Sequence, residues 1–334
     1  MTSDLREMKA AYDALPGPSA EATARAREVM LAPRPRPKRR LLRAGTVGLA
    51  AAVAAVAFVV FPGGGATPAG AAELLQRAAT AAARQPAPLK GQFVYVRQRE
   101  QRWILTLAEG GARSEYTEES DTESWIPAAD PAGALMRTRY GRRTVHSGQV
   151  PDTMPTPGTV AHHTGQCAAL VAADTSNLPT DPGELLARIR ADAEATVGKE
   201  RPEPTEDQFR RQVERTVASR LLTLAQNPFP GYGLREAVLG ALARLPAATM
   251  RTDLTDAAGR QGVGASIRYQ GPDGAETAEL IFEPDTYRFL GWRVLSQRPD
   301  GGAEVLRAAT ATLEVKIVDT MPEIPADAPP PTTC

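Results

Sequence analysis

The most apolar stretch of the chain spans residues 44–61, where eighteen consecutive positions carry no charged side chain. A helix of this length is about 27 Å long, close to the thickness of the hydrocarbon layer of a membrane. A Pro-rich basic run, residues 33–40, precedes the stretch, and Pro62 followed by three glycines ends it. A buried Ala-rich helix of a soluble domain is the alternative, but these flanks favour a transmembrane helix.

Beyond the apolar stretch, the pattern predicts one helix at residues 69–84, before Pro86 and Pro88. The apolar positions then repeat every second residue, which is typical of strands. The first strands are expected at 92–97, 102–107, 114–118, 122–126 and 135–140. Residues 146–180 are polar and contain several prolines, and we expect a loop there.

Helical periodicity returns after this loop, at residues 183–196, 206–225 and 234–245. Asp181 and Thr205 are suitable N-caps for the first two of these helices. A second set of strands is expected at 249–254, 262–269, 276–282, 287–298 and 304–318, with Asp273-Gly274 and Glu283-Pro284-Asp285 as tight turns. Strands on both sides of a three-helix insert predict an α+β fold, a curved antiparallel sheet with the helices on one face, preceded by one transmembrane helix.

Five parts of the chain follow from these elements. They are a basic arm (1–43), the transmembrane helix (44–61), a linker with one helix (62–90), an α+β domain (91–320) and a Pro-rich tail without regular structure (321–334).

Charge is distributed unevenly along the chain, although 39 basic residues balance 39 acidic ones overall. Residues 1–43 hold ten basic and five acidic side chains, so the arm is positive and the rest of the chain is negative. Six basic residues flank the apolar stretch on its N-terminal side: Arg34, Arg36, Lys38, Arg39, Arg40 and Arg43. By the positive-inside rule, the arm is cytoplasmic and the α+β domain is extracytoplasmic, at the cell membrane. Cleavage after Ala71 is an alternative to a permanent anchor, but the long N-terminal arm favours the anchor.

The arm itself has two patterns of short amphipathic helices, at about residues 4–15 and 19–31. Such helices cannot form a core by themselves, but they are suited to docking on a partner. An anti-sigma-like role is one hypothesis, in which the arm binds a sigma factor; the arm contains no His or Cys for a zinc-type version of it. An unstructured basic tether attracted to anionic lipid is the alternative.

Several segments together resemble an actinobacterial family of uncharacterised single-pass membrane proteins. The segments are 5–8, the junction of basic and apolar residues, 71–75, 91–96, 123–127, 256–263 and 281–291. The resemblance implies membrane anchoring and genes often near those of sigma factors, and it supplies no catalytic residues. The strand pattern is also similar to the half-barrel of lipoprotein carriers and periplasmic sigma-pathway sensors, which implies an apolar or envelope-derived ligand.

Residues with catalytic or ligating chemistry are few. No G-x-S-x-G or H-E-x-x-H motif is present, and no cofactor or nucleic-acid partner is expected. His162, His163 and Cys167 have spacing that a metal site could use, but their Pro-rich surroundings favour solvated loop histidines. The acidic run Glu118, Glu119, Asp121 and Glu123 is interpreted as a hairpin tip in solvent, with cation binding as the alternative.

Two further sets of residues complete the candidates. Trp103, Trp125 and Trp292 are suited either to an apolar groove or to core packing. Cys167 and Cys334 lie beyond the apolar stretch, where an oxidising compartment permits a disulfide; two unpaired thiols are the alternative. The sequence thus predicts a membrane-anchored binding or sensing protein without catalytic activity.

Overall fold

The computed structural model describes residues 68–107, 113–128, 133–165, 175, 177–199, 205–227, 233–246, 248–271, 274–297 and 304–333. The arm (1–43), its six flanking basic residues, the apolar stretch (44–61), Cys167 and Cys334 lie outside these ranges. Among the helices that the structure describes, none combines the length and the apolar character needed to cross a membrane.

Ten strands form one sheet in the order β10-β4-β3-β2-β1-β9-β8-β7-β6-β5. Every neighbouring pair is antiparallel except β10 and β4. Their bounds are β1 Phe93–Leu107, β2 Arg113–Pro127, β3 Leu135–Ser147, β4 Val160–Thr164, β5 Ala248–Thr255, β6 Gln261–Gly271, β7 Gly274–Phe282, β8 Phe289–Ser296, β9 Val305–Val318 and β10 Thr332–Thr333.

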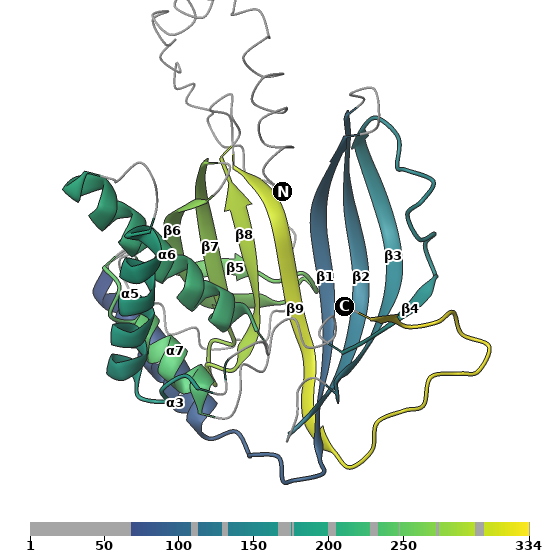
Figure 1. Cartoon of the computed structure of the whole chain (residues 1–334), viewed down its shortest axis with the longest axis horizontal. Helices are drawn as coiled ribbons and strands as arrows, with labels where there is room; N and C mark the ends of the chain where they lie inside the picture. The colour runs from purple at the N-terminus through teal and green to yellow at the C-terminus, as the bar shows by residue number, and fades with distance from the viewer. Residues whose placement is uncertain are drawn as a thin grey trace, which may run out of the picture. The chain divides into compact units, whose positions relative to one another are not determined.

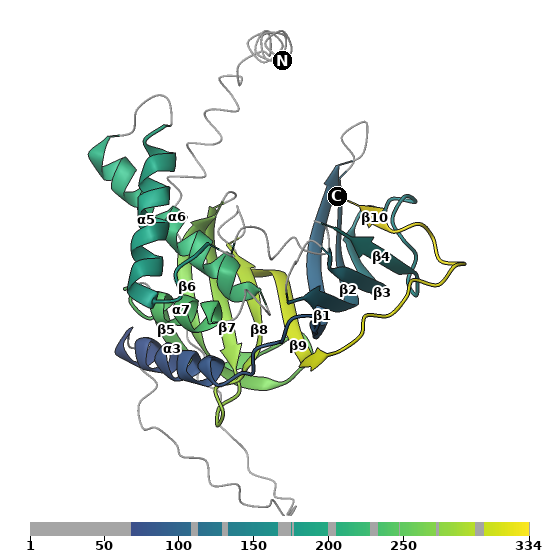
Figure 2. The same cartoon turned by 60° about the horizontal axis from the view of Figure 1, so that its bottom comes forward.

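Four helices pack against this sheet: α3 Pro68–Ala83, α5 Pro182–Val197, α6 Glu206–Gln226 and α7 Leu234–Leu242. They gather over β5–β8, and no helix of the described residues covers β1–β4 (Figures 1 and 2). The predicted α+β class is therefore confirmed. We call β5–β8 with the helices the helix-covered part and β1–β4 the wing; β9 joins them by pairing with both β8 and β1.

The predicted three-helix insert is confirmed at α5–α7, and local capping explains where two of its helices begin. The Asp181 carboxylate accepts hydrogen bonds from the backbone N–H groups of Gly183 and Glu184, at 2.7 and 2.9 Å. Thr205 and Gln208 form a reciprocal capping box at the start of α6. Apolar side chains of the helices and of the sheet then pack together, and those with less than 2 % exposure include Leu75, Leu221, Leu242, Ile267, Leu280 and Phe282. Since Leu75 lies on α3, this helix belongs to the core.

The wing corrects the prediction, because β1 and β2 are each one continuous strand of fifteen residues instead of two short strands. The acidic run predicted to form a hairpin tip lies in the middle of β2. Each of its four carboxylates contacts an arginine on a neighbouring strand, with N–O distances between 2.5 and 3.0 Å: Glu118 with Arg143, Glu119 with Arg142, Asp121 with Arg99, and Glu123 with Arg137. These cross-strand ion pairs replace the apolar alternation by which strands are recognised.

Two further corrections concern the segments predicted to be irregular. The expected loop 146–180 contains β4, which extends the sheet beyond β3. In the tail, expected to lack regular structure, Thr332 and Thr333 pair in parallel with His163 and Thr164.

Candidate functional site

The most distinctive cavity of the described residues lies where α3 and α7 meet β8 and β9. It has a volume of about 150 Å³ and adjoins a second one of about 370 Å³. The two cavities share five lining residues: Gln85, Pro86, Arg235, Arg288 and Phe289. The first is closed on its sheet side by Val94 of β1 and by β9 residues, and the second on its helix side by α3 alanines and Leu239.

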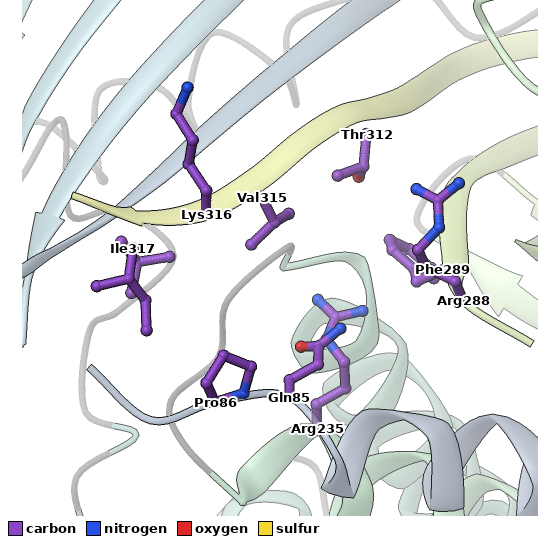
Figure 3. Close-up of a pocket in the computed structure, with 10 residues that line it drawn as sticks. Gln85, Pro86, Arg235, Arg288, Phe289, Thr312, Val315, Lys316 and Ile317 are labelled. Carbon is purple, nitrogen blue, oxygen red and sulfur yellow. The ribbon is translucent and has the colours of Figure 1, made fainter.

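A β-bulge determines which β9 side chains face the first cavity. In the ladder with β1, Gln98 pairs with Thr312 while Arg97 pairs with Glu314, so Leu313 is an extra residue. The bulge brings Thr312, Val315 and Ile317 to one face. Figure 3 shows Val315 and Ile317 directed towards the side where Pro86 and Arg235 lie, and Lys316 directed away from it. Val315 is 42 % exposed, so an apolar side chain stands at the cavity mouth.

Arg235 is the buried cation of this site. It is 6 % exposed and lies in the first turn of α7, with its guanidinium carbon 4.5 Å from the centre of the Phe289 ring. Its Nη2 donates a hydrogen bond to the backbone carbonyl of Asn227, whereas its Nη1 is buried and has no hydrogen-bond partner among the described residues. Within the described ranges, no carboxylate forms an ion pair with Arg235.

Burial lowers the pKa of the Arg235 guanidinium from 12.5 to about 10. The charged form is therefore less stable in the folded chain than in water, by roughly 3 kcal/mol. The two nearest helix ends act in opposite senses, since the first turn of α7 is the positive pole of its dipole and Asn227 follows the negative pole of α6. Arg235 thus remains a charge with incomplete compensation beside a cavity.

Thr312 is the second polar group of the cavity without a hydrogen-bond partner. It is 4 % exposed, and its hydroxyl finds no hydrogen-bond partner in the part of the chain that the structure describes. Its backbone is held firmly, because Arg260 Nη2 donates hydrogen bonds to the carbonyls of Thr312 and Leu290, each at 2.9 Å. The fully buried carboxylate of Asp256 orients Arg260 at 2.6 Å.

The turn between β7 and β8 forms another wall. Tyr287 has the left-handed φ of 56°, and its hydroxyl accepts a hydrogen bond from Arg77 of α3 at 2.8 Å. Arg288 pairs with Glu283 at 3.1 Å, and hydrogen bonds from Thr286 and Arg288 hold the pKa of the Glu283 carboxyl below its ordinary value. Arg288 is thus neutralised locally, and Arg235 is the buried cation of the lining, without a carboxylate partner in the described ranges.

The predicted aromatic residues do not share this site. Trp125 packs with Tyr95 and Leu135 in a small cluster of the wing, and its ring centre lies 5.2 Å from that of Tyr95. Trp103 lies beneath the guanidinium of Arg307, at 4.2 Å, and Trp292 packs at the margin of the main core. The β-ladders place Trp103 and Trp125 on the opposite face of the sheet from Trp292, so the three tryptophans do not line one groove.

The histidines also differ from their prediction as solvated loop residues. His162 and His163 lie in β4, and His162 is 8 % exposed with a buried Nδ1 that has no hydrogen-bond partner among the described residues. Burial, followed by the neighbouring His162, lowers the pKa of His163. Within the described ranges, no three His, Cys, Asp or Glu side chains gather in a geometry that could hold a metal.

Arg235 was not among the residues expected from the sequence, although a signal for it exists. Arg235, Val238, Leu239 and Leu242 follow the spacing i, i+3, i+4 and i+7, which places the arginine in the apolar stripe of its helix. Charged residues are almost never fully buried without a partner, and an arginine in such a stripe therefore marks a site worth inspection.

The cavity walls and Arg235 together are suited to binding a small molecule. The lining offers apolar contact and a fixed hydrogen-bond donor, and the described residues place no nucleophile next to a base in it. Comparison of the chain with protein-family models, curated proteins and solved structures finds no match.

Proposed function

We propose that the chain is a membrane-anchored binding protein without catalytic activity, whose extracytoplasmic domain holds a small, largely apolar ligand in the cavity between α3, α7, β8 and β9. The observation that carries this proposal is the lining, in which Pro86, Val94, Phe289, Val315 and Ile317 present apolar surface next to a few polar groups. This composition is typical of sites for small molecules.

The anchor rests on the sequence. Residues 44–61 are proposed to span the cell membrane once, with the basic arm in the cytoplasm and the domain outside. A reporter that is active only outside the cytoplasm, fused after Cys334, is expected to be active, and the chain is expected to require detergent for extraction. Activity of a cytoplasm-specific reporter at the same position would overturn this topology.

Ligand binding is tested by calorimetric titration of 1-hexanol into the full-length chain in nanodiscs of zwitterionic lipid, with empty nanodiscs as the blank. Val315→Trp fills the cavity mouth and is expected to weaken binding at least tenfold. The matched control is Val145→Trp, an equally exposed valine of the wing (49 % against 42 %), which is expected to leave binding unchanged. Absence of binding to the unmodified chain, both of 1-hexanol and of anions with the same hydrocarbon chain, would overturn the proposal.

A further inference from the structure

The structure assigns a head-group preference to this cavity: we infer that its ligand is an anionic amphiphile whose carboxylate or phosphate is bound by Arg235 Nη1 and the Thr312 hydroxyl. The inference rests on the proposed function and specifies the ligand class. Two buried polar groups line the same cavity and both have no hydrogen-bond partner among the described residues.

The donors match an oxyanion in chemistry. A guanidinium donates only, and a hydroxyl can donate, so neither group requires an acid proton on the ligand. Hydrogen bonds in which one partner is ionised are shorter and about twice as strong as neutral ones. An anion at Nη1 would also stabilise the charged form of Arg235 against the cost of its burial.

The other two cations of the first cavity's lining, Arg288 and Lys316, are already engaged. Arg288 is paired with Glu283 and half exposed, and Lys316 is directed to the other face of β9, where its Nζ lies 4.8 Å from the centre of the Tyr95 ring. An anion entering the cavity therefore meets one free buried charge, which favours a single head group over a polyanion.

The apolar walls account for the remainder of the ligand. Phe289 and Val315 stand on either side of the space next to Arg235 (Figure 3). The adjoining cavity continues along Ala78, Ala82 and Leu239. A ligand with its head group at Arg235 and a short hydrocarbon chain along the apolar walls fits this arrangement of polar and apolar surface.

The test compares four probes on the full-length chain in zwitterionic nanodiscs: hexanoate, hexyl phosphate, 1-hexanol and acetate. At least one of the two six-carbon anions is expected to bind tenfold to a hundredfold more tightly than 1-hexanol, and acetate much more weakly than hexanoate. The stronger of the two anions identifies the head group as a carboxylate or a phosphate.

Variants assign the preference to its residues. Arg235→Met is expected to bring the anions level with 1-hexanol, and Thr312→Val, which keeps the shape of the side chain, is expected to reduce the preference several-fold. Arg142→Gln removes an exposed arginine of the wing and is expected to leave the affinities of all four probes unchanged. If Arg235→Met fails to fold, the change in anion preference caused by Thr312→Val tests the assignment instead.

The outcomes separate the two proposals. Equal affinity for 1-hexanol and both anions in the unmodified chain would overturn the anionic head group while the proposed function stands. Equal affinity for acetate and hexanoate would overturn the amphiphile. Absence of binding by all four probes would overturn the proposed function itself.

Discussion

In the helix-covered part of the sheet, β6 and β7 direct Ile267, Leu280 and Phe282 against the helices, and these side chains are fully buried. In the wing, β1, β2 and β3 are at least as long as β6 and β7, yet the residues in their middle are charged. Arginines on one strand form ion pairs with carboxylates on the neighbouring strand. One hydrogen-bonded sheet thus contains a part with an apolar core and a part with cross-strand ion pairs, and β9 joins the two.

The difference teaches where the stability of the chain resides. Burial of apolar surface contributes about 25 cal/mol per Å² and does not depend on salt, whereas an exposed ion pair contributes about 0–1 kcal/mol and is screened. The wing has one small apolar cluster, around Tyr95, Trp125 and Leu135. We therefore expect it to respond to salt and acid, and the helix-covered part to respond to loss of side-chain volume.

The largest effect is expected from Leu221→Ala, which opens a space among the helices at a residue with no exposed surface. The free energy of unfolding should fall by about 3 kcal/mol. Leu105→Ala makes the same change in the wing at 43 % exposure, and it should cost less than about 1 kcal/mol. Urea denaturation of the full-length chain, followed by tryptophan fluorescence, measures both values, and equal losses would contradict the comparison.

The next effect concerns the least exposed ion pair of the wing. Glu118 and Arg143 lie 2.5 Å apart, and each side chain is 9 % exposed. Glu118→Gln leaves the charge of Arg143 with a neutral neighbour and is expected to cost about 2–3 kcal/mol. Adding Arg143→Met removes that charge and should recover most of the loss; a double variant as unstable as the single one would show that the pair acts through shape alone.

A smaller effect is expected from acid, through Glu123. Burial favours the protonated form of this carboxyl, but hydrogen bonds from Tyr95 and Arg137 outweigh it, and the pKa lies below its ordinary value of 4.5. The stability from this site is fully present above that value and is lost as the pH falls through the lowered pKa. Glu123→Gln should cost about 1.5 kcal/mol at pH 7.

The two chains should converge in stability as the pH falls through the lowered pKa of Glu123, because the carboxyl of the unmodified chain is then protonated as well. Urea denaturation between pH 3 and pH 7 follows this convergence. A constant difference across that range would exclude the ionised form of Glu123 as the origin of the effect.

The smallest effect is expected from Arg142→Gln. Arg142 is 75 % exposed and pairs with Glu119 at 2.8 Å. Its removal should lower the free energy of unfolding by less than any of the changes above, and the loss should vanish in about 1 M salt. Denaturation at low and high salt checks this, and a loss that persists at high salt would count against the electrostatic account of the exposed pairs.

The same contrast explains how far the sequence predicts the fold. The helix-covered part was predicted well, because Asp181 and Thr205 mark helix starts and the apolar periods are regular; α5 and α6 begin and end within one residue of the expected bounds. The wing was predicted in fragments. Residues 98–101 and 119–121 are polar on both faces, and a run of that kind is locally indistinguishable from a turn.

The site was harder to predict than the fold, for a related reason. The arginines that complete the acidic run of β2 lie 14 to 25 residues away in sequence, so only the register brings them together. Arg235 was missed because sequence reasoning assigns charged residues to the surface, and its neighbours in space, Phe289 and Thr312, come from strands that follow it by more than fifty residues. Local rules are expected to fail where a buried charge serves a site.

The extra residue Leu313 shifts the alternation of side chains along β9, and this shift affects the positions that follow Leu313. Side chains on a strand alternate between the two faces, so if β9 paired with β1 without the bulge, every residue after Leu313 would lie on the other face. Glu314 and Lys316 would then take the places of Val315 and Ile317 beside Arg235, and a carboxylate encoded in the chain would stand where the proposed ligand binds. One irregular position in the pairing with β1 thus decides whether this wall of the cavity is apolar or charged.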